Sequence, residues 1–208
     1  RPALAEGLGF VLSQRAARSF VVVDACRGLA IGTIVVLSPV FVARALGLPP
    51  EVSGYLISAS GVGMLGGSLV VGLVGQRWPT GWLLVGGMLA NGLSHAFFGL
   101  APDFASAAGL RVVAGVSVAA SGIARRTLLQ ALVPDAFRGR VFGVLTATIN
   151  LTSLVAMAAG GLLADIVGVR ETHALAGVMV MAGAIAARGV VGRQSPGQAN
   201  QALPEHQA

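Results

Sequence analysis

The sequence contains few charged residues, one cysteine and no lysine. Charged residues make up 11% of its 208 residues, whereas soluble domains carry about a quarter. A fold of this size could not cover its surface at that composition, so a water-soluble domain is excluded. The single cysteine, Cys26, excludes an internal disulfide and a cysteine metal site, and we interpret it as a small buried packing residue.

Nucleic-acid binding is also disfavoured, although the formal net charge is +6. The 14 basic residues are all arginines, and they are spread through short segments rather than clustered with aromatic side chains. We therefore expect no nucleic-acid partner. The chain also lacks a nucleotide-binding loop, so we expect no cofactor.

Apolar residues and glycine dominate the chain and give it an integral membrane composition. Hydrophobic residues account for 55% and glycine for 30 residues, and small residues let helices pack closely in lipid. Six apolar runs approach the roughly 20 residues that cross a bilayer: 21–45, 52–74, 82–100, 104–124, 141–164 and 172–191. The sequence predicts an all-α membrane protein with six transmembrane helices over residues 21–192.

The arginines also predict the orientation of these helices. With six spans, both termini lie on one side, and that side holds ten arginines against two on the other. By the positive-inside rule, both termini face the cytoplasm, and the chain is a multi-pass protein of the cytoplasmic membrane.

The two ends are expected to lie outside the bundle. Residues 1–20 place Leu4, Leu8, Val11 and Leu12 on one helical face, which predicts an amphipathic linker helix at the membrane surface. Residues 193–208 are polar and broken by proline and glycine, which predicts disorder. Because the first residue is Arg1, we expect the chain to be part of a longer protein.

Charged residues inside the spans are candidates for function. Arg111 lies about 10 Å from the outer end of its span at 1.5 Å per residue, so it should either snorkel, pair with the backbone or face a polar cavity. Asp24 and Arg27 can pair across one helical turn. Asp24 is the only carboxylate near the body of a span away from the outer edge, which makes it the candidate for proton coupling.

Polar residues also form two patterns within the spans. Thr146, Asn150, Ser153 and Met157 recur on one face of the fifth span, which predicts either helix contacts or the wall of a substrate pathway. Asn91 and His95 lie four residues apart in the third span, where an interhelical hydrogen bond is more plausible than a metal site.

Glycines in the second span point to packing rather than nucleotide binding. Gly61, Gly63 and Gly66 spell GxGxxG, but no strand precedes them and no suitably placed acid follows. Gly63 and Gly67 form a GxxxG face that Gly54 and Ser58 extend, which predicts close packing on a neighbouring helix. Ser58 and Ser60 with His95 or His173 leave an intramembrane serine protease as a weaker alternative.

Residues 127–145, TLLQALVPDAFRGRVFGVL, carry the most specific motif. This segment resembles the cytoplasmic connection between helices ten and eleven of major facilitator superfamily transporters, closest to the branch that exports drugs and siderophores. The matching positions are Pro134, Asp135, Arg138, Gly139, Arg140 and Gly143. We expect Pro134 to break the helix, Asp135 to cap the next one, the two arginines to meet anionic headgroups, and the glycines to allow close helix approach.

Three weaker features agree with this resemblance. Residues 6–20 resemble the interdomain linker, and residues 72–77 resemble the loop motif between helices two and three, repeated between eight and nine. Arg111, Gly115 and Ala119 resemble the arginine motif of helix four, repeated in helix ten.

The resemblance implies the C-terminal half of a twelve-helix fold, with helices seven to twelve in this chain. It implies a transporter rather than an enzyme: a proton-coupled exporter of amphipathic small molecules that works by alternating access. Its partners would be the N-terminal six-helix half, the lipid bilayer and a small-molecule substrate. We assign Thr146, Asn150 and Ser153 to the substrate wall, with Arg111 as a possible charge in the cavity. A self-associating six-span scaffold without transport activity is the other alternative.

Overall fold

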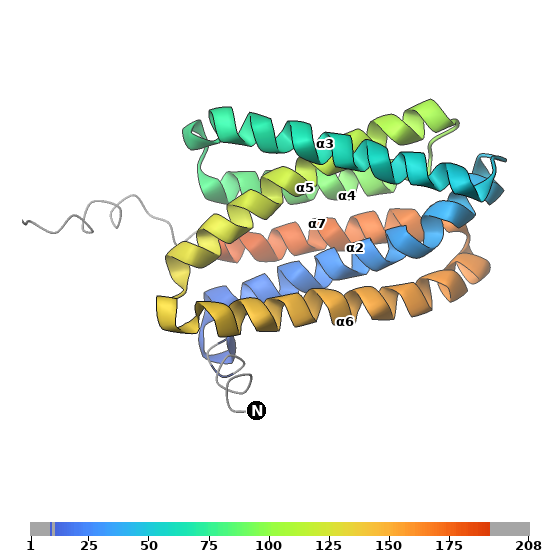
Figure 1. Cartoon of the computed structure of the whole chain (residues 1–208). Coiled ribbons are helices and arrows are strands. Elements are labelled where there is room, and N and C mark those ends of the chain that lie inside the picture. The colour runs from blue at the N-terminus through green and yellow to red at the C-terminus, as the bar shows by residue number, and fades with distance from the viewer. Residues whose placement is uncertain (1–8, 10, 192–208) are drawn as a thin grey trace, which may run out of the picture.

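The computed structural model describes residue 9 and residues 11–191, and six long helices fill most of this range. The helices run side by side, and successive helices point in opposite directions (Figure 1). Two short 3-10 turns, Pro50–Val52 and Gly75–Arg77, lie in the connections. The helices are α2 (Arg15–Ala45), α3 (Ser53–Val74), α4 (Thr80–Phe98), α5 (Phe104–Leu132), α6 (Asp135–Val167) and α7 (Val169–Val191).

Each predicted span corresponds to one helix. By length and composition, α2, α3, α5 and α6 can cross a membrane. The crossing of α4 and α7 stays a prediction, which gains support because both helices run alongside the other four (Figure 1). The prediction of an all-helical membrane protein therefore agrees with the structure, within the part of the chain that it describes.

The bundle is an open series of helices rather than a closed ring. In spatial order the helices are α3, α5, α4, α7, α2 and α6, and each packs along the next. The two end helices, α3 and α6, therefore each have one closely packed neighbour. In Figure 1, α3 and α5 lie on one side of the bundle and α2 and α6 on the other. Side chains of all four helices line a cleft between them.

Two apolar clusters hold the bundle together. We call the end where α5 stops and α6 starts the α5–α6 end. Phe20, Leu128 and Leu145 belong to the cluster at this end, and Leu37, Phe41 and Phe98 belong to the cluster at the opposite end. Most polar residues of the bundle interior lie between the two clusters or beside them.

Glycine sets the spacing between α3 and α5, as the GxxxG face predicts. A Cβ atom at Gly63 would clash with the carbonyl oxygen of Val112, and one at Gly67 would meet the backbone of Val116. Gly54 and Ser58 do not extend this contact, because both are exposed. Since Gly63 and Gly67 pack inside the chain, this face is not available for the self-association on which the scaffold alternative depends.

Several helix boundaries differ from the predicted ones. Helix α5 continues to Leu132, eight residues beyond the predicted end, so Arg125 and Arg126 lie in the helix and not in a loop. Helix α6 starts at Asp135 instead of residue 141. The N-terminus of α2 at Arg15 takes in part of the predicted linker. Residues 1–8 and 10 of that linker and the tail from residue 192 onward lie outside the described residues.

The start of α5 is capped by an acid outside the membrane-spanning segment. The side chain of Asp103 accepts a hydrogen bond of 2.8 Å from the backbone N–H of Ser106. The Ser106 hydroxyl completes the capping box, which satisfies two free N–H groups of the first turn. These hydrogen bonds hold the pKa of Asp103 below its usual range, because they stabilise the charged carboxylate.

Candidate functional site

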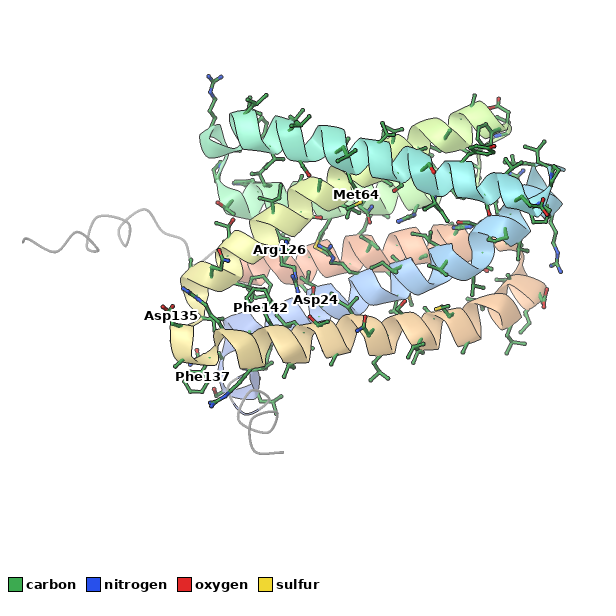
Figure 2. All side chains as sticks on the ribbon, in the orientation of Figure 1. Asp24, Met64, Arg126, Asp135, Phe137 and Phe142 are labelled. Atoms are coloured by element: carbon green, nitrogen blue, oxygen red, sulfur yellow. The ribbon has the colours of Figure 1, made fainter. Side chains whose placement is uncertain are left out.

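The cleft between α3, α5, α2 and α6 is the main candidate site. It has a volume of about 380 Å³, within the range of small-molecule sites. Met64 and Phe142 lie on opposite sides of it, and Arg126 lies on its α5 wall (Figure 2). The lining combines apolar side chains with arginine and hydroxyl groups, so the cleft is amphipathic.

A buried ion pair joins the two helices at the back of the cleft. The Arg125 guanidinium on α5 donates to the Asp24 carboxylate on α2, and Asp24 is fully buried. The second carboxylate oxygen, Oδ1, has no hydrogen-bond partner among the described residues. The predicted pair of Asp24 with Arg27 is therefore wrong: the carboxylate turns to the neighbouring helix instead of one turn along its own.

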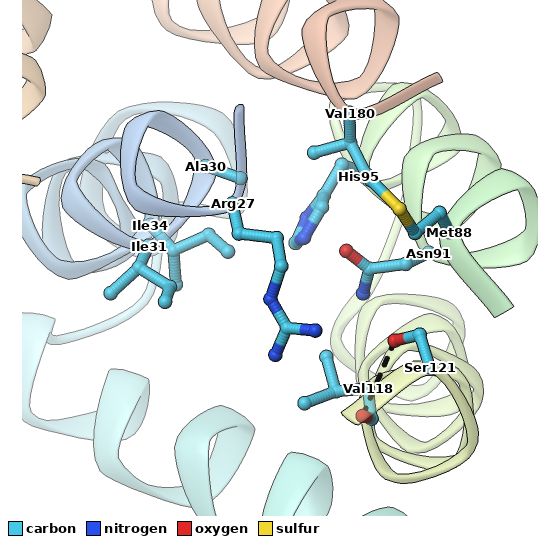
Figure 3. Close-up of a pocket in the computed structure, with 10 residues that line it drawn as sticks. All are labelled: Arg27, Ala30, Ile31, Ile34, Met88, Asn91, His95, Val118, Ser121 and Val180. Carbon is cyan, nitrogen blue, oxygen red and sulfur yellow. Dashed lines mark hydrogen bonds between the residues drawn. The ribbon is translucent and has the colours of Figure 1, made fainter. Parts of the chain in front are cut away.

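Because Asp24 is held by Arg125, the Arg27 side chain is left to extend into the bundle. It reaches from α2 towards Val118 and Ser121 on α5 (Figure 3). Its Nη1 atom is buried and makes no hydrogen bond to any part of the chain that the structure describes. Arg27 lines both the main cleft and a smaller cavity of about 70 Å³ between α2, α4, α5 and α7.

Asn91 and His95 line this smaller cavity from α4 (Figure 3). The side-chain amide of Asn91 donates a hydrogen bond of 3.3 Å to the carbonyl oxygen of Ala114 on α5. The predicted interhelical hydrogen bond is therefore present for Asn91. Both side chains therefore line the same cavity as Arg27.

The polar stripe on α6 lies partly at the cleft. Thr146 lines it, and Asn150 is exposed one turn further along the same face. Ser153 is half-buried, and its backbone carbonyl lies against Gly32 of α2. The assignment of these three residues to a substrate wall stays a prediction, and Thr146 is the one that borders the described cleft.

Arg111 lies away from the cleft, in the apolar cluster at the opposite end. Its Nη2 atom donates a hydrogen bond of 2.6 Å to the Ser38 hydroxyl, and its guanidinium lies 4.5 Å from the ring centre of Phe98. Because Arg111 is almost fully buried, it does not snorkel outward. Its contact with substrate stays a prediction.

The PDxxRGRxxG motif forms a tight joint between α5 and α6. Pro134 is the residue before α6, and Asp135 is the first helical residue rather than a side-chain cap. The Arg138 side chain donates to the carbonyl oxygens of Gln130, at 2.6 Å, and Val133, at 3.2 Å. These are carbonyls at the C-terminus of α5, which a helix leaves without partners. Arg138 also pairs with Asp135 at 2.7 Å.

Two further roles were expected of this motif. The Arg138 guanidinium is engaged with α5 and with Asp135, and its contact with lipid headgroups stays a prediction. Gly139 and Gly143 would have open space around an added Cβ atom, so they allow no close helix approach within the described chain. The remaining arginine of the motif, Arg140, stacks over Phe137 at 5.7 Å.

Sequence reasoning missed the arginines that line the cleft. Arg125 and Arg126 were expected in a loop because they follow the predicted end of the fourth apolar run, 104–124. The apolar residues Leu128 and Leu129 were the available signal, because they continue the helical pattern and are buried. Arg27 was assigned to an ion pair with Asp24 on the same helix, so its position facing α5 was not predicted.

Ser58 and His173 give the protease alternative no support. The Ser58 hydroxyl is exposed and donates to the carbonyl oxygen of Gly54 in its own helix. His173 is buried against the aromatic rings of Phe41 and Phe98, in the apolar cluster at the end opposite the α5–α6 joint.

Comparison with known proteins agrees with the helical arrangement. Residues 20–206 match the major facilitator superfamily. The chain is 35% identical over 154 residues to the uncharacterized MFS-type transporter YfiS of Bacillus subtilis (strain 168). This alignment covers 67% of the chain and 34% of YfiS, so the chain spans about a third of the length of that relative. The helical bundle, the amphipathic cleft and these similarities together show that the chain belongs to the major facilitator superfamily.

Proposed function

We propose that this chain is the C-terminal six-helix half of a proton-coupled exporter of amphipathic small molecules, of the drug or siderophore type. The observation that carries the proposal is the amphipathic cleft on the open side of the helix series. In transporters of this kind, substrate binds between two bundles that rock against each other. The cleft would then form one wall of the site, and the N-terminal half would form the other.

The proposed orientation places the α5–α6 end in the cytoplasm and both termini on that side of the cell membrane. It rests on the arginines, because Arg18, Arg77, Arg138 and Arg140 lie at or beyond the helix ends there. An excess of arginine on one side is the usual mark of the cytoplasmic face.

Asp24 is the proposed coupling residue. Protonation would neutralise its carboxylate and weaken its pairing with Arg125, which is the contact that ties α2 to α5 behind the cleft. Loss of that contact would let the two helices separate, so proton binding and helix movement would be linked. An intramembrane acid with one defined partner is well suited to such a role.

The first experiment uses the full-length protein in proteoliposomes, with efflux of a fluorescent amphipath as the readout. We expect efflux that needs an imposed proton gradient and stops when an ionophore collapses it. Efflux that continues without any proton or ion gradient would contradict secondary transport.

The second experiment replaces the coupling residue. Asp24→Asn should abolish gradient-driven efflux while gradient-independent exchange of substrate persists, because the amide, like a protonated Asp24, carries no charge but cannot release a proton. Asp165→Asn is the matched control, since Asp165 is exposed at the opposite end and pairs with Arg44. Equal gradient-driven efflux by the Asp24 variant and the native protein would rule out Asp24 as the coupling site.

A further inference from the structure

We propose that the cleft binds the anionic group of its substrate, and that Arg27 and Arg126 are the residues that hold it. The expected ligand is an organic anion with an apolar body, such as an aromatic carboxylate. This inference rests on the proposed transport function, because it assigns a charge to the transported molecule. It differs from the substrate wall on α6, which contains no cation.

The first step of the argument is the charge around the cleft. Arg27, Arg125 and Arg126 line it, and Asp24 is the one acid that pairs with any of them in the described structure. Asp24 pairs directly with Arg125 and also attracts Arg27 electrostatically. This single acid cannot balance three guanidinium groups, so the cleft keeps an excess of positive charge. A charge is costly where it is buried in a membrane interior, as the Nη1 atom of Arg27 is, so an anion from outside the chain would be stabilised there.

The second step is the position of Arg27. Its side chain lies at the boundary of the two cavities, and its buried Nη1 atom has no partner within the described part of the chain. The facing residue on α5 is Gly122, where even an added Cβ atom would stay 4.0 Å from Nη2. The guanidinium therefore has a free donor at the boundary of the two cavities and only a glycine facing it, and guanidinium donors suit a carboxylate well.

The third step is the surroundings of the two arginines. Arg126 lies on the α5 wall of the cleft, and Phe142 lies across from it on α6 (Figure 2). Met64 and Ile149 add apolar surface, and Thr146 adds a hydroxyl group. A molecule with a carboxylate at one end and a ring or chain at the other would match this distribution, whereas a cationic amphipath would face two guanidinium groups.

The test compares three fluorescent probes that share one apolar body and differ in charge. Dansylglycine is anionic, dansylglycinamide is neutral and N-(2-aminoethyl)dansylamide is cationic. Binding is measured by fluorescence titration of the full-length protein in nanodiscs of zwitterionic lipid, with empty nanodiscs as the blank. We expect the anion to bind roughly tenfold more tightly than the neutral probe, as one charge-assisted hydrogen bond would give, and the cation to bind most weakly.

Variants then connect this preference to the two arginines. Arg27→Gln and Arg126→Gln should each weaken dansylglycine binding by roughly tenfold and leave dansylglycinamide binding nearly unchanged. Arg44→Gln is the matched control, because Arg44 is exposed at the opposite end of the bundle. A variant that only damages the fold would weaken all three probes together, and circular dichroism on the same samples checks the helix content.

The outcomes separate this inference from the transport proposal. Anion preference that depends on Arg27 and Arg126 supports it, even if the protein moves no probe across a vesicle membrane. Equal affinity for the three probes, stronger binding of the cation, no detectable anion binding, or anion binding that both variants retain would overturn it. If one of these contradicting results is found together with gradient-driven efflux of the cation, the transport proposal is supported and the anion site is wrong.

Discussion

Arg125 and Arg126 are neighbours in the sequence, yet they have different surroundings. Both line the cleft, but Arg125 is buried and pairs with Asp24, whereas Arg126 is exposed. The difference follows from the 100° step between successive residues of a helix, which turns one side chain towards α2 and the next towards the open side. Two identical residues therefore have separate roles, one in structure and one at the candidate site.

This difference predicts unequal effects of the two substitutions on stability. Arg125→Gln should lower the free energy of unfolding by about 3 kcal/mol, because it leaves the Asp24 carboxylate buried without its partner. Arg126→Gln should change it by less than about 0.5 kcal/mol, as expected for an exposed side chain. Equilibrium unfolding of the full-length protein in mixed micelles measures both.

The double variant sharpens the same prediction. Asp24→Asn combined with Arg125→Gln should recover most of the stability lost by Arg125→Gln alone, because no uncompensated charge remains. Equal losses in the two arginine single variants, or a double variant with the summed loss of its two parts, would show that the pair is not the cause.

The contacts of a single residue could be predicted only where its partner lies close to it in the sequence. Asp24 was recognisable because an acid inside a span is rare. Its partner is 101 positions away, and no local pattern links the two. Arg111 shows the same limit, because its contact with Ser38 spans 73 positions. Charged residues inside membrane spans can be identified in the sequence because they are rare there. Their contacts become known only from the packing of the helices.

At the scale of helices, the apolar runs predicted the elements well and their ends less well. The errors occur where arginine lies near a helix end. Arg138 binds carbonyls at the end of α5, and Arg170 donates to the carbonyl of Gly99, after α4, at 2.8 Å. Both had been counted as loop charges. A guanidinium can complete the hydrogen bonding of a neighbouring helix end, so its charge does not mark a loop.

Helix packing gives a prediction at this scale. Gly63→Ala should destabilise the protein by roughly 1 kcal/mol or more, because the new methyl group would meet the rigid backbone of Val112 and separate α3 from α5. Gly66→Ala is the matched control three residues away, where open space surrounds an added Cβ atom. There the substitution should be neutral or stabilising.

Thermal unfolding of the full-length protein in detergent compares the two glycine variants under one condition. The packing argument predicts a lower midpoint for the Gly63 variant and an unchanged or higher one for the Gly66 variant. Equal midpoints would mean that the contact between α3 and α5 does not depend on the missing side chain.

At the scale of the whole molecule, the helix series has one face that opens onto the cleft and another that turns outward. On α6, Thr146 lies on the cleft side. Leu151 is exposed, and five residues of helical rotation place it well away from Thr146. Exposure of many large apolar side chains on the outer face fits a surface that meets lipid.

Thiol labelling tests which of these faces contacts water. In a Cys26→Ala background, a charged methanethiosulfonate reagent should modify Thr146→Cys rapidly and Leu151→Cys slowly, because the reagent does not enter lipid. Open membrane fragments give the reagent access from both sides. Faster modification of the Leu151 variant would show that water contacts the face of α6 that carries Leu151, and it would contradict the prediction.

The joint made by Arg138 also limits how the cleft can change shape. Helices α5 and α6 carry facing walls of the cleft, and a connection of only residues 133 and 134 joins them at one end. Arg138 holds both sides of that connection, through the carbonyls of α5 and the Asp135 carboxylate of α6. The separation of α5 and α6 is therefore set at this connection. Any change in the distance between the two helices would be largest at their other ends.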